Sequence, residues 1–157
     1  MKQKPFDVDD AIKRAAICRA TRERVGLTRD ELARLVNVSE RSVKMWESHS
    51  GDGSCPDDVI ELLYELLDKQ DDDVARAVEL AKLVISSAGH RPDTLILPYY
   101  PRQLTYKECH PDSSGFYCVV NATLRAIAVE LERLGIEVEW RYATPEIVAS
   151  SDFGWLS

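Results

Sequence analysis

The sequence predicts a mainly α-helical chain in two parts: a five-helix domain over residues 8–88, and a small α+β domain over residues 90–157 with two strands and one long helix. Three observations support this fold class. Apolar residues recur at intervals of three and four through most of the first part, as on one face of a helix. The run Gly89-His90-Arg91-Pro92 then breaks the pattern. Beyond it, two runs of strand-like composition, residues 94–100 and 136–142, flank a long amphipathic segment.

The length and composition agree with two small domains. The chain has 157 residues, 45% of them hydrophobic, so a packed core is expected. No apolar run approaches the roughly 20 residues that span a bilayer, and the first residues lack the apolar segment of a signal peptide. We therefore expect a cytoplasmic protein.

The first helix is expected from Val8 to about Val25. Gly26 follows it and suits the left-handed backbone at which many helices end. The residues that recur at helical spacing in this segment are Val8, Ile12, Ala15, Ala16, Arg19 and Arg22.

Residues 28–48 predict two short helices joined by a tight turn. Thr28 is a favourable N-cap, and Glu31 three residues later completes a capping box. Asn37 tolerates the left-handed backbone that a sharp turn needs. Ser39 then caps the second helix.

The second of these helices has an inward and an outward face. Val43 and Trp46, three residues apart, are expected to pack against the first helix. The side chains that remain outside at the start of this helix are Glu40, Arg41 and Lys44. This arrangement is typical of a DNA-binding helix-turn-helix, whose second helix enters the major groove.

From Arg29 to Ser48 the chain resembles the lambda-repressor/Cro type of helix-turn-helix, also called the Xre family. The shared pattern is Glu-Leu-Ala in the first helix, a four-residue turn, Ser-Val, and an aromatic-Glu pair at the end. Asn37, where the family usually has Gly, and Met45, where a polar residue can read a base, depart from it.

The resemblance implies one structural ion pair, and the positions of the outward-facing residues predict the DNA contacts. A structural ion pair would join Arg22 of the first helix to Glu47, without reading a base. Arg41 would contact a base edge, most simply that of a guanine. Glu40 would either accept a hydrogen bond from the amino group of a cytosine or remain an exposed structural residue. Arg29 and Ser48 would bind phosphate. The full expected DNA-binding set is Arg29, Ser39, Glu40, Arg41, Ser42, Lys44 and Ser48.

Two further helices complete the predicted N-terminal domain. Pro56 suits the first turn of a helix that runs to about Lys69. The triplet Asp71-Asp72-Asp73 is expected to begin the next helix, because acidic residues stabilise a helix N-terminus.

The second part of the chain alternates strands and helices. Residues 94–100 are expected to be an edge strand, or one that ends at Pro98, and residues 101–115 a loop. A helix is expected from Phe116 to Leu134, followed by a half-buried strand and an ordered tail or short helix.

A two-stranded unit is marginal in water, so this part is expected to form a homodimer. The apolar helix seam could alternatively be core within one chain. The expected interface residues are Val120, Leu124, Ile127, Leu131, Ile136, Val138 and Trp140.

The order of elements extends the family resemblance. Trp46-Glu47-Ser48 is followed by Pro-Asp-Asp-Val at 56–59, a further helix, a strand, a helix and an aromatic-rich strand. Over residues 8–142 the chain is similar to the anti-CRISPR-associated repressors of phages and their uncharacterised bacterial relatives. This implies a dimeric autorepressor of transcription at an inverted repeat of double-stranded DNA. Residues 101–115 and the tail after 143 depart from that layout, so an added ligand or partner role stays open.

Charge and reactive residues narrow the alternatives. Residues 1–54 carry 11 basic and 9 acidic side chains, or +2, whereas residues 55–157 carry 9 and 18, or −9. The four cysteines form no zinc-binding spacing, and the three histidines lie in loops without a nucleophile arrangement, so we expect no metal, no cofactor and no enzyme. The main alternative is an antitoxin whose C-terminal half binds a toxin or another protein.

Overall fold

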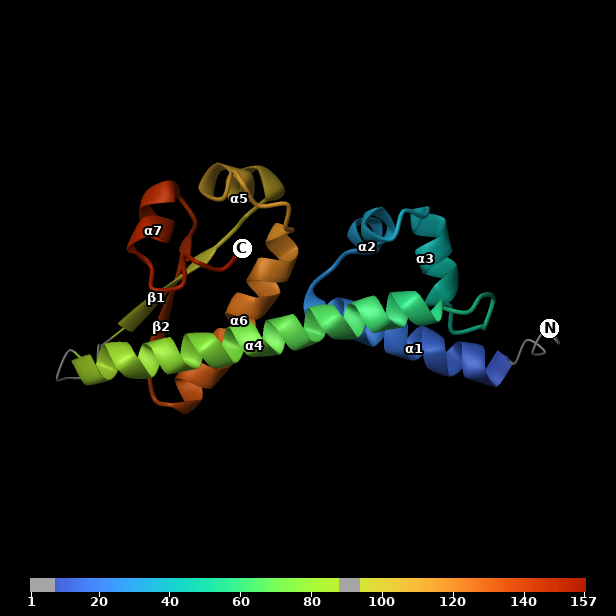
Figure 1. The fold of residues 1–157 in the computed structure, drawn as a ribbon, viewed down its shortest axis with the longest axis horizontal. Coiled ribbons are helices and arrows are strands. Elements are labelled where there is room, and N and C mark those ends of the chain that lie inside the picture. Colours follow the sequence, from blue (N-terminus) through green and yellow to red (C-terminus); the bar gives the residue numbers. More distant parts are fainter. Residues whose placement is uncertain (1–7, 88–93) are drawn as a thin grey trace. The chain divides into compact units, whose positions relative to one another are not determined.

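The computed structural model describes residues 8–87 and 94–157. Within these ranges the chain forms seven helices and two strands, so it is mainly helical with one small sheet, as the sequence predicts (Figure 1). The chain divides into two compact units, residues 1–68 (unit 1) and 69–157 (unit 2). The domain boundary expected at residues 88–90 lies outside the described residues.

Unit 1 begins with three helices: α1 (Val8–Val25), α2 (Arg29–Leu35) and α3 (Glu40–Trp46). The expected limits of α1 are confirmed. Gly26, with φ of 98°, ends it as predicted, and the Gly26 and Leu27 amides donate to the Arg22 carbonyl.

The local signals around α2 and α3 are also confirmed. The Thr28 side chain accepts from the Glu31 amide at 3.1 Å, while the Glu31 carboxylate accepts from the Thr28 amide at 2.8 Å. Asn37 adopts a φ of 54°, the left-handed conformation predicted for the turn. Ser39 accepts from the Ser42 amide at 3.2 Å and caps α3.

Small and branched apolar side chains fill the core of unit 1. Val43 of α3 is fully buried against α2, as predicted. The buried apolar residues of this unit are Ala11, Ala15, Cys18, Val25, Leu27, Leu32, Ala33, Val43, Cys55, Val59, Leu63 and Leu67.

The two helices expected after residue 56 form one continuous helix, α4 (Asp57–Ser87). The prediction that Asp71-Asp72-Asp73 begins a new helix is therefore wrong. No glycine or proline interrupts this stretch, and the triplet lies mid-helix, where Asp73 pairs with Lys69 one turn earlier. The part of α4 from Lys69 onward belongs to unit 2.

Unit 2 contains a parallel pair of strands, β1 (Thr94–Tyr99) and β2 (Glu137–Tyr142). Parallel strands need a long crossover, and α6 (Tyr117–Arg133) lies within it and contacts both strands. Gly135, with φ of 74°, follows α6 as predicted. The buried core of the unit consists of Ala77, Ala81, Leu95, Leu97, Tyr100, Tyr106, Val120, Leu124, Ile127, Ala128, Leu131, Ile136, Ala143, Val148, Phe153 and Leu156.

Two short helices complete the unit. The loop predicted over residues 101–115 contains α5 (Gln103–Cys109), because its prolines at 101 and 111 flank the helix without entering it. The tail forms α7 (Pro145–Ser150), one of the two outcomes expected for it. β1 continues through Pro98 to Tyr99 and does not end at the proline.

The expected dimer seam needs correction. Its four helix residues and Ile136 are between 0% and 5% exposed, because they form the core of the chain's own unit 2. A second copy cannot reach them in the folded chain, which fits the alternative of an intramolecular core. Val138 is half-buried, and Trp140 at 41% exposure is the expected interface residue that remains accessible.

None of the described helices has the length and apolar character that crossing a membrane requires.

Candidate functional site

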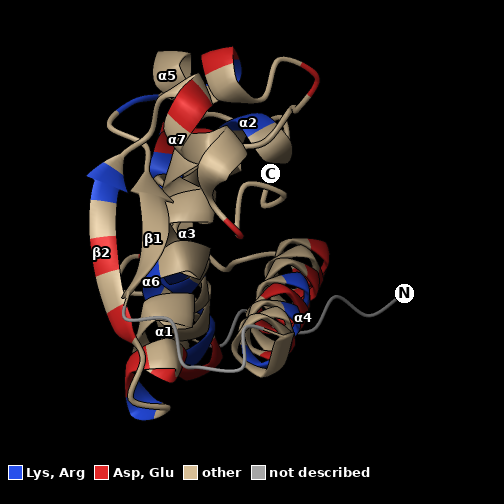
Figure 2. Ribbon diagram, turned by 90° about the vertical axis from the view of Figure 1, so that its left-hand side faces the viewer, with Lys and Arg blue, Asp and Glu red and all other residues tan. Residues whose placement is uncertain are grey.

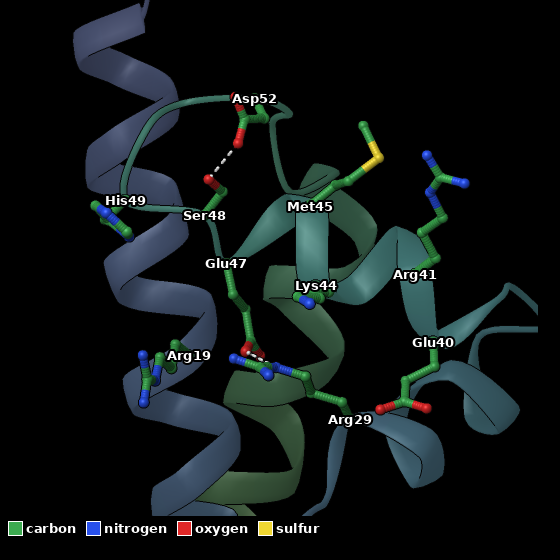
Figure 3. Close-up of a pocket in the computed structure, with 10 residues that line it drawn as sticks. All are labelled: Arg19, Arg29, Glu40, Arg41, Lys44, Met45, Glu47, Ser48, His49 and Asp52. Carbon is green, nitrogen blue, oxygen red and sulfur yellow. Dashed lines mark hydrogen bonds and ion pairs between the residues drawn. The ribbon is translucent and has the colours of Figure 1, made fainter.

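A concave surface of about 700 Å³ lies on unit 1, between α1, α3 and the segment that follows α3 (Figure 3). It brings together five of the seven expected DNA-binding residues and Glu47. The residues that line it are Arg19, Arg29, Glu40, Arg41, Lys44, Met45, Glu47, Ser48, His49 and Asp52.

Glu47 anchors the base of this surface. Its side chain is fully buried and accepts hydrogen bonds from Arg22 Nε at 2.5 Å and Nη2 at 3.1 Å. Arg22 also donates to the Leu27 carbonyl at 2.6 Å, so one guanidinium joins α1, the turn before α2 and the end of α3. The predicted pair of Arg22 and Glu47 is therefore present.

Arg29 also forms an ion pair with Glu47, a contact that the sequence did not predict. Its Nε donates to Glu47 Oε2 at 2.8 Å, and its side chain is 34% exposed. Glu47 therefore faces two guanidinium groups, which neutralise its buried charge. Figure 3 shows Arg29 reaching from α2 to this carboxylate at the floor of the surface.

Arg41 and Lys44 are the exposed cations of α3. Within residues 8–87 and 94–157 neither of them makes an ion pair. In Figure 3, Arg41 and Met45 extend away from α1 on the same side of α3, and Met45 is 42% exposed. These side chains are free to contact a ligand.

The remaining polar residues of α3 are partly engaged. Ser39 and Ser42 lie outside the concave surface, and their hydroxyl oxygens are 3.0 Å apart in the cap of α3. Glu40 is exposed and points toward α2 in Figure 3. Ser39 and Ser42 thus have a structural role that sequence reasoning assigned only to Ser39.

The rim on the other side comes from the segment after α3. Ser48 donates to Asp52 Oδ2 at 2.6 Å. Arg19 of α1 is paired with Glu23 at 2.9 Å. Sequence reasoning missed Arg19, His49 and Asp52 as lining residues. Arg19 could have been found, since it precedes Arg22 by one turn, but no local pattern indicates the contact between Ser48 and Asp52.

Two thiols lie in the core of the same unit. Cys18 and Cys55 are free and fully buried. A hydrogen bond from the Cys55 thiol lowers the pKa of Cys18, and that interaction together with burial raises the pKa of Cys55. Among the described residues, no group of three His, Cys, Asp or Glu side chains could hold a metal ion.

Comparison with known proteins identifies no relatives from which a function could be transferred: no family model and no curated protein matches the chain.

Proposed function

We propose that this chain is a sequence-specific DNA-binding regulator of transcription, in which α2 and α3 act as a helix-turn-helix of the Xre type. The observation that carries the proposal is which charged side chains of unit 1 are paired and which are not. Glu47 is buried and neutralised by Arg22 and Arg29, whereas Arg41 and Lys44 extend from α3 without an ion pair among the described residues. A short helix that presents free cations is suited to the major groove.

In this proposal α3 lies in the major groove and Arg41 donates both ends of its guanidinium to the O6 and N7 atoms of a guanine. Lys44, one turn further along, contacts a base or a phosphate on the same strand. Arg29 and Ser48 bind the sugar–phosphate backbone on either side, and the ion pairs of Glu47 hold α1 and α3 at a constant angle.

The charge distribution supports the same division of roles. The positive net charge of residues 1–54 favours contact with phosphate, and the net charge of −9 beyond them disfavours non-specific binding by the rest of the chain. One helix-turn-helix reads only a few base pairs, so useful specificity requires two copies. We therefore propose a dimeric cytoplasmic repressor at an inverted repeat, including one in its own promoter.

A second candidate is an antitoxin that binds a protein through unit 2. The exposed aromatic side chains of β2, Trp140 at 41% and Tyr142 at 72%, favour some partner at that strand. An antitoxin would carry the same DNA-binding unit but would lie beside a toxin gene and bind its product.

A reporter gene under the DNA upstream of the chain's own gene tests repression. Expression of the wild-type chain should lower reporter output, and Arg41→Ala should restore it. Arg34→Ala is the matched control, because Arg34 is an exposed arginine of α2 that pairs with Asp30 and lies outside the concave surface. Unchanged reporter output with the wild-type chain would contradict autorepression.

A further inference from the structure

The outer edge of β2 is open. In the described part of unit 2 the sheet has two strands, so β2 pairs with β1 along one edge and leaves backbone N–H and C=O groups unpaired by any strand along the other. Figure 2 shows no further helix or strand of this unit beyond that edge. Such an edge is a template for another strand unless proline, a bulge or charged side chains block it. β2 has the sequence Glu-Val-Glu-Trp-Arg-Tyr and an uninterrupted register with β1, so it has no proline and no bulge. Its charged side chains are of both signs, so they disfavour only those strands whose charges do not complement them.

The outer edge of β1 is different. It contains Pro98, which has no N–H to donate, and the Ile96 carbonyl accepts a hydrogen bond from the Ser151 hydroxyl at 3.0 Å. Because that edge is blocked and capped by the chain itself, β2 is the side on which the sheet can grow.

One face of β2 carries charges of both signs. Glu139 and Arg141 lie two residues apart, and Arg141 Nε is 2.6 Å from Glu139 Oε1. Both side chains are about half exposed, at 46% and 45%. Neither of them contributes to the core of unit 2, so both are available to a strand laid alongside.

The other face carries exposed aromatic side chains. Trp140 packs edge-on against Tyr99 of β1, with ring centroids 5.6 Å apart. With Arg125 and Tyr142, these rings line an open groove of about 470 Å³, whose wall also includes Arg141. Exposed aromatic and arginine side chains are enriched at protein–protein interfaces.

We propose that the strand which pairs with this edge is β2 of a second copy of the chain. The two strands run antiparallel, and the two-fold axis lies midway between Trp140 of one copy and Trp140 of the other. Glu139 then lies directly opposite Arg141 of the second copy, and Arg141 opposite its Glu139. On the other face Trp140 meets Trp140, and Val138 meets Tyr142. The two sheets become one sheet of four strands.

Charge selects this register over its neighbours. Side chains alternate between faces, so a two-fold axis must pass through a residue and not between residues. A two-fold axis at Glu139 would place the two Glu139 carboxylates opposite each other, and an axis at Arg141 would do the same with two guanidinium groups. An axis at Val138 would place Glu137 of each copy opposite Glu139 of the other. Like charges directly opposite each other destabilise a strand pair. Of the four central positions, only an axis at Trp140 places unlike charges opposite each other and no like charges opposite each other.

The inference rests on the proposed function in one respect, since an inverted repeat requires a two-fold dimer. It assigns to that dimer a surface different from the helix seam, which is occupied by the core. It can be tested without DNA, so its failure is distinct from a failure of Arg41 to read a base.

The test is sedimentation equilibrium of the full chain with two charge reversals, Glu139→Arg and Arg141→Glu. The wild-type chain should be a dimer at micromolar concentration. Each variant alone opposes like charges twice per dimer and should dimerise about tenfold more weakly or worse. An equimolar mixture opposes only unlike charges and should regain the wild-type dimer as a heterodimer.

Recovery by mixing excludes misfolding as the cause, because a misfolded chain would not be rescued by a partner. Reversal of the exposed α6 pair, Glu130→Arg and Arg133→Glu, is the matched control and should leave dimerisation unchanged. A monomeric wild-type chain, variants that dimerise like the wild type, or a mixture that stays monomeric would each overturn the inference. A wild-type monomer would leave the edge to a different protein, as an antitoxin requires.

Discussion

Arg22 and Glu47 form a buried ion pair with two hydrogen bonds, and this pair ties α1 to the residue that follows α3. The Glu47 side chain has no exposed surface and that of Arg22 is 7% exposed. Burial of a charge is costly unless the charge is paired, so each side chain depends on the other. The pair thereby positions α3 without using any of its outward side chains.

Truncation of Glu47 should destabilise unit 1 strongly. Glu47→Ala leaves the Arg22 charge buried without its carboxylate, at a cost of about 3–5 kcal/mol in the free energy of unfolding. Urea denaturation followed by circular dichroism measures this cost. The control is Asp30→Ala, which removes an exposed pair with Arg34 in the same unit and should cost less than about 1 kcal/mol. Equal effects of the two variants would show that the buried pair contributes nothing special.

Arg41→Ala should weaken binding to the specific site by about 1–3 kcal/mol, with the loss concentrated at one base pair of each half-site. The side chain is exposed, so the fold should be unaffected. Affinities for the specific site and for random DNA, measured at one salt concentration, separate the two roles. Equal losses on both would identify a phosphate contact. Arg34→Ala should leave both affinities unchanged.

Loss of Arg29 or of Ser48 should weaken binding to every DNA sequence by the same factor, because both are proposed to contact phosphate. Arg29→Gln removes one cation, so it should weaken binding throughout and lower the slope of log affinity against log salt by about 0.9. Ser48→Ala removes a neutral hydroxyl that donates to Asp52 in the DNA-free chain and would turn to the phosphate on binding, so it should weaken binding with the slope unchanged. A change in sequence preference with either variant would contradict the assignment to phosphate. Because Arg29 also pairs with Glu47, the free energy of unfolding of the Arg29→Gln chain must be measured in parallel.

Asn121 of α6 completes the end of β1. Its side-chain oxygen accepts from the Tyr100 amide at 3.0 Å, and its amide donates to the Tyr100 carbonyl at 2.9 Å. Asn121→Leu leaves both backbone groups buried without partners and should cost about 2–6 kcal/mol, at about 1–3 kcal/mol for each group. Thr123→Val removes one hydroxyl from the same buried part of α6 and leaves no backbone group without a partner, so it should cost less in the same urea denaturation. If Asn121→Leu cost no more than Thr123→Val, the paired hydrogen bonds would not be the cause.

Local signals predicted unit 1 well. The capping box of Thr28 and Glu31, the left-handed Asn37 and the terminal Gly26 each depend on residues close in sequence, so their outcome can be read from the chain. The pair of Arg22 and Glu47 came only from the family resemblance. The contact of Arg29 with Glu47 was missed, because it joins residues of different helices.

Unit 2 was harder to predict for physical reasons. Acidic residues favour a helix start but do not break a helix, so α4 runs through Asp71-Asp72-Asp73. The seam from Val120 to Leu131 has the spacing of an interface, but the same spacing describes a helix packed on its own sheet. Only the arrangement of α6 against β1 and β2 distinguishes the two, and it leaves the β2 edge as the accessible surface.

Sequencing of the genomic DNA fragments that the full chain retains is the most direct measurement of sequence-specific binding. We predict one enriched inverted repeat, with half-sites separated by about one helical turn, roughly 34–36 Å, and located upstream of the chain's own gene. Arg41→Ala should abolish the enrichment, and Arg34→Ala should preserve it. Retained fragments that share no sequence, or retention that Arg41→Ala leaves unchanged, would contradict the proposal.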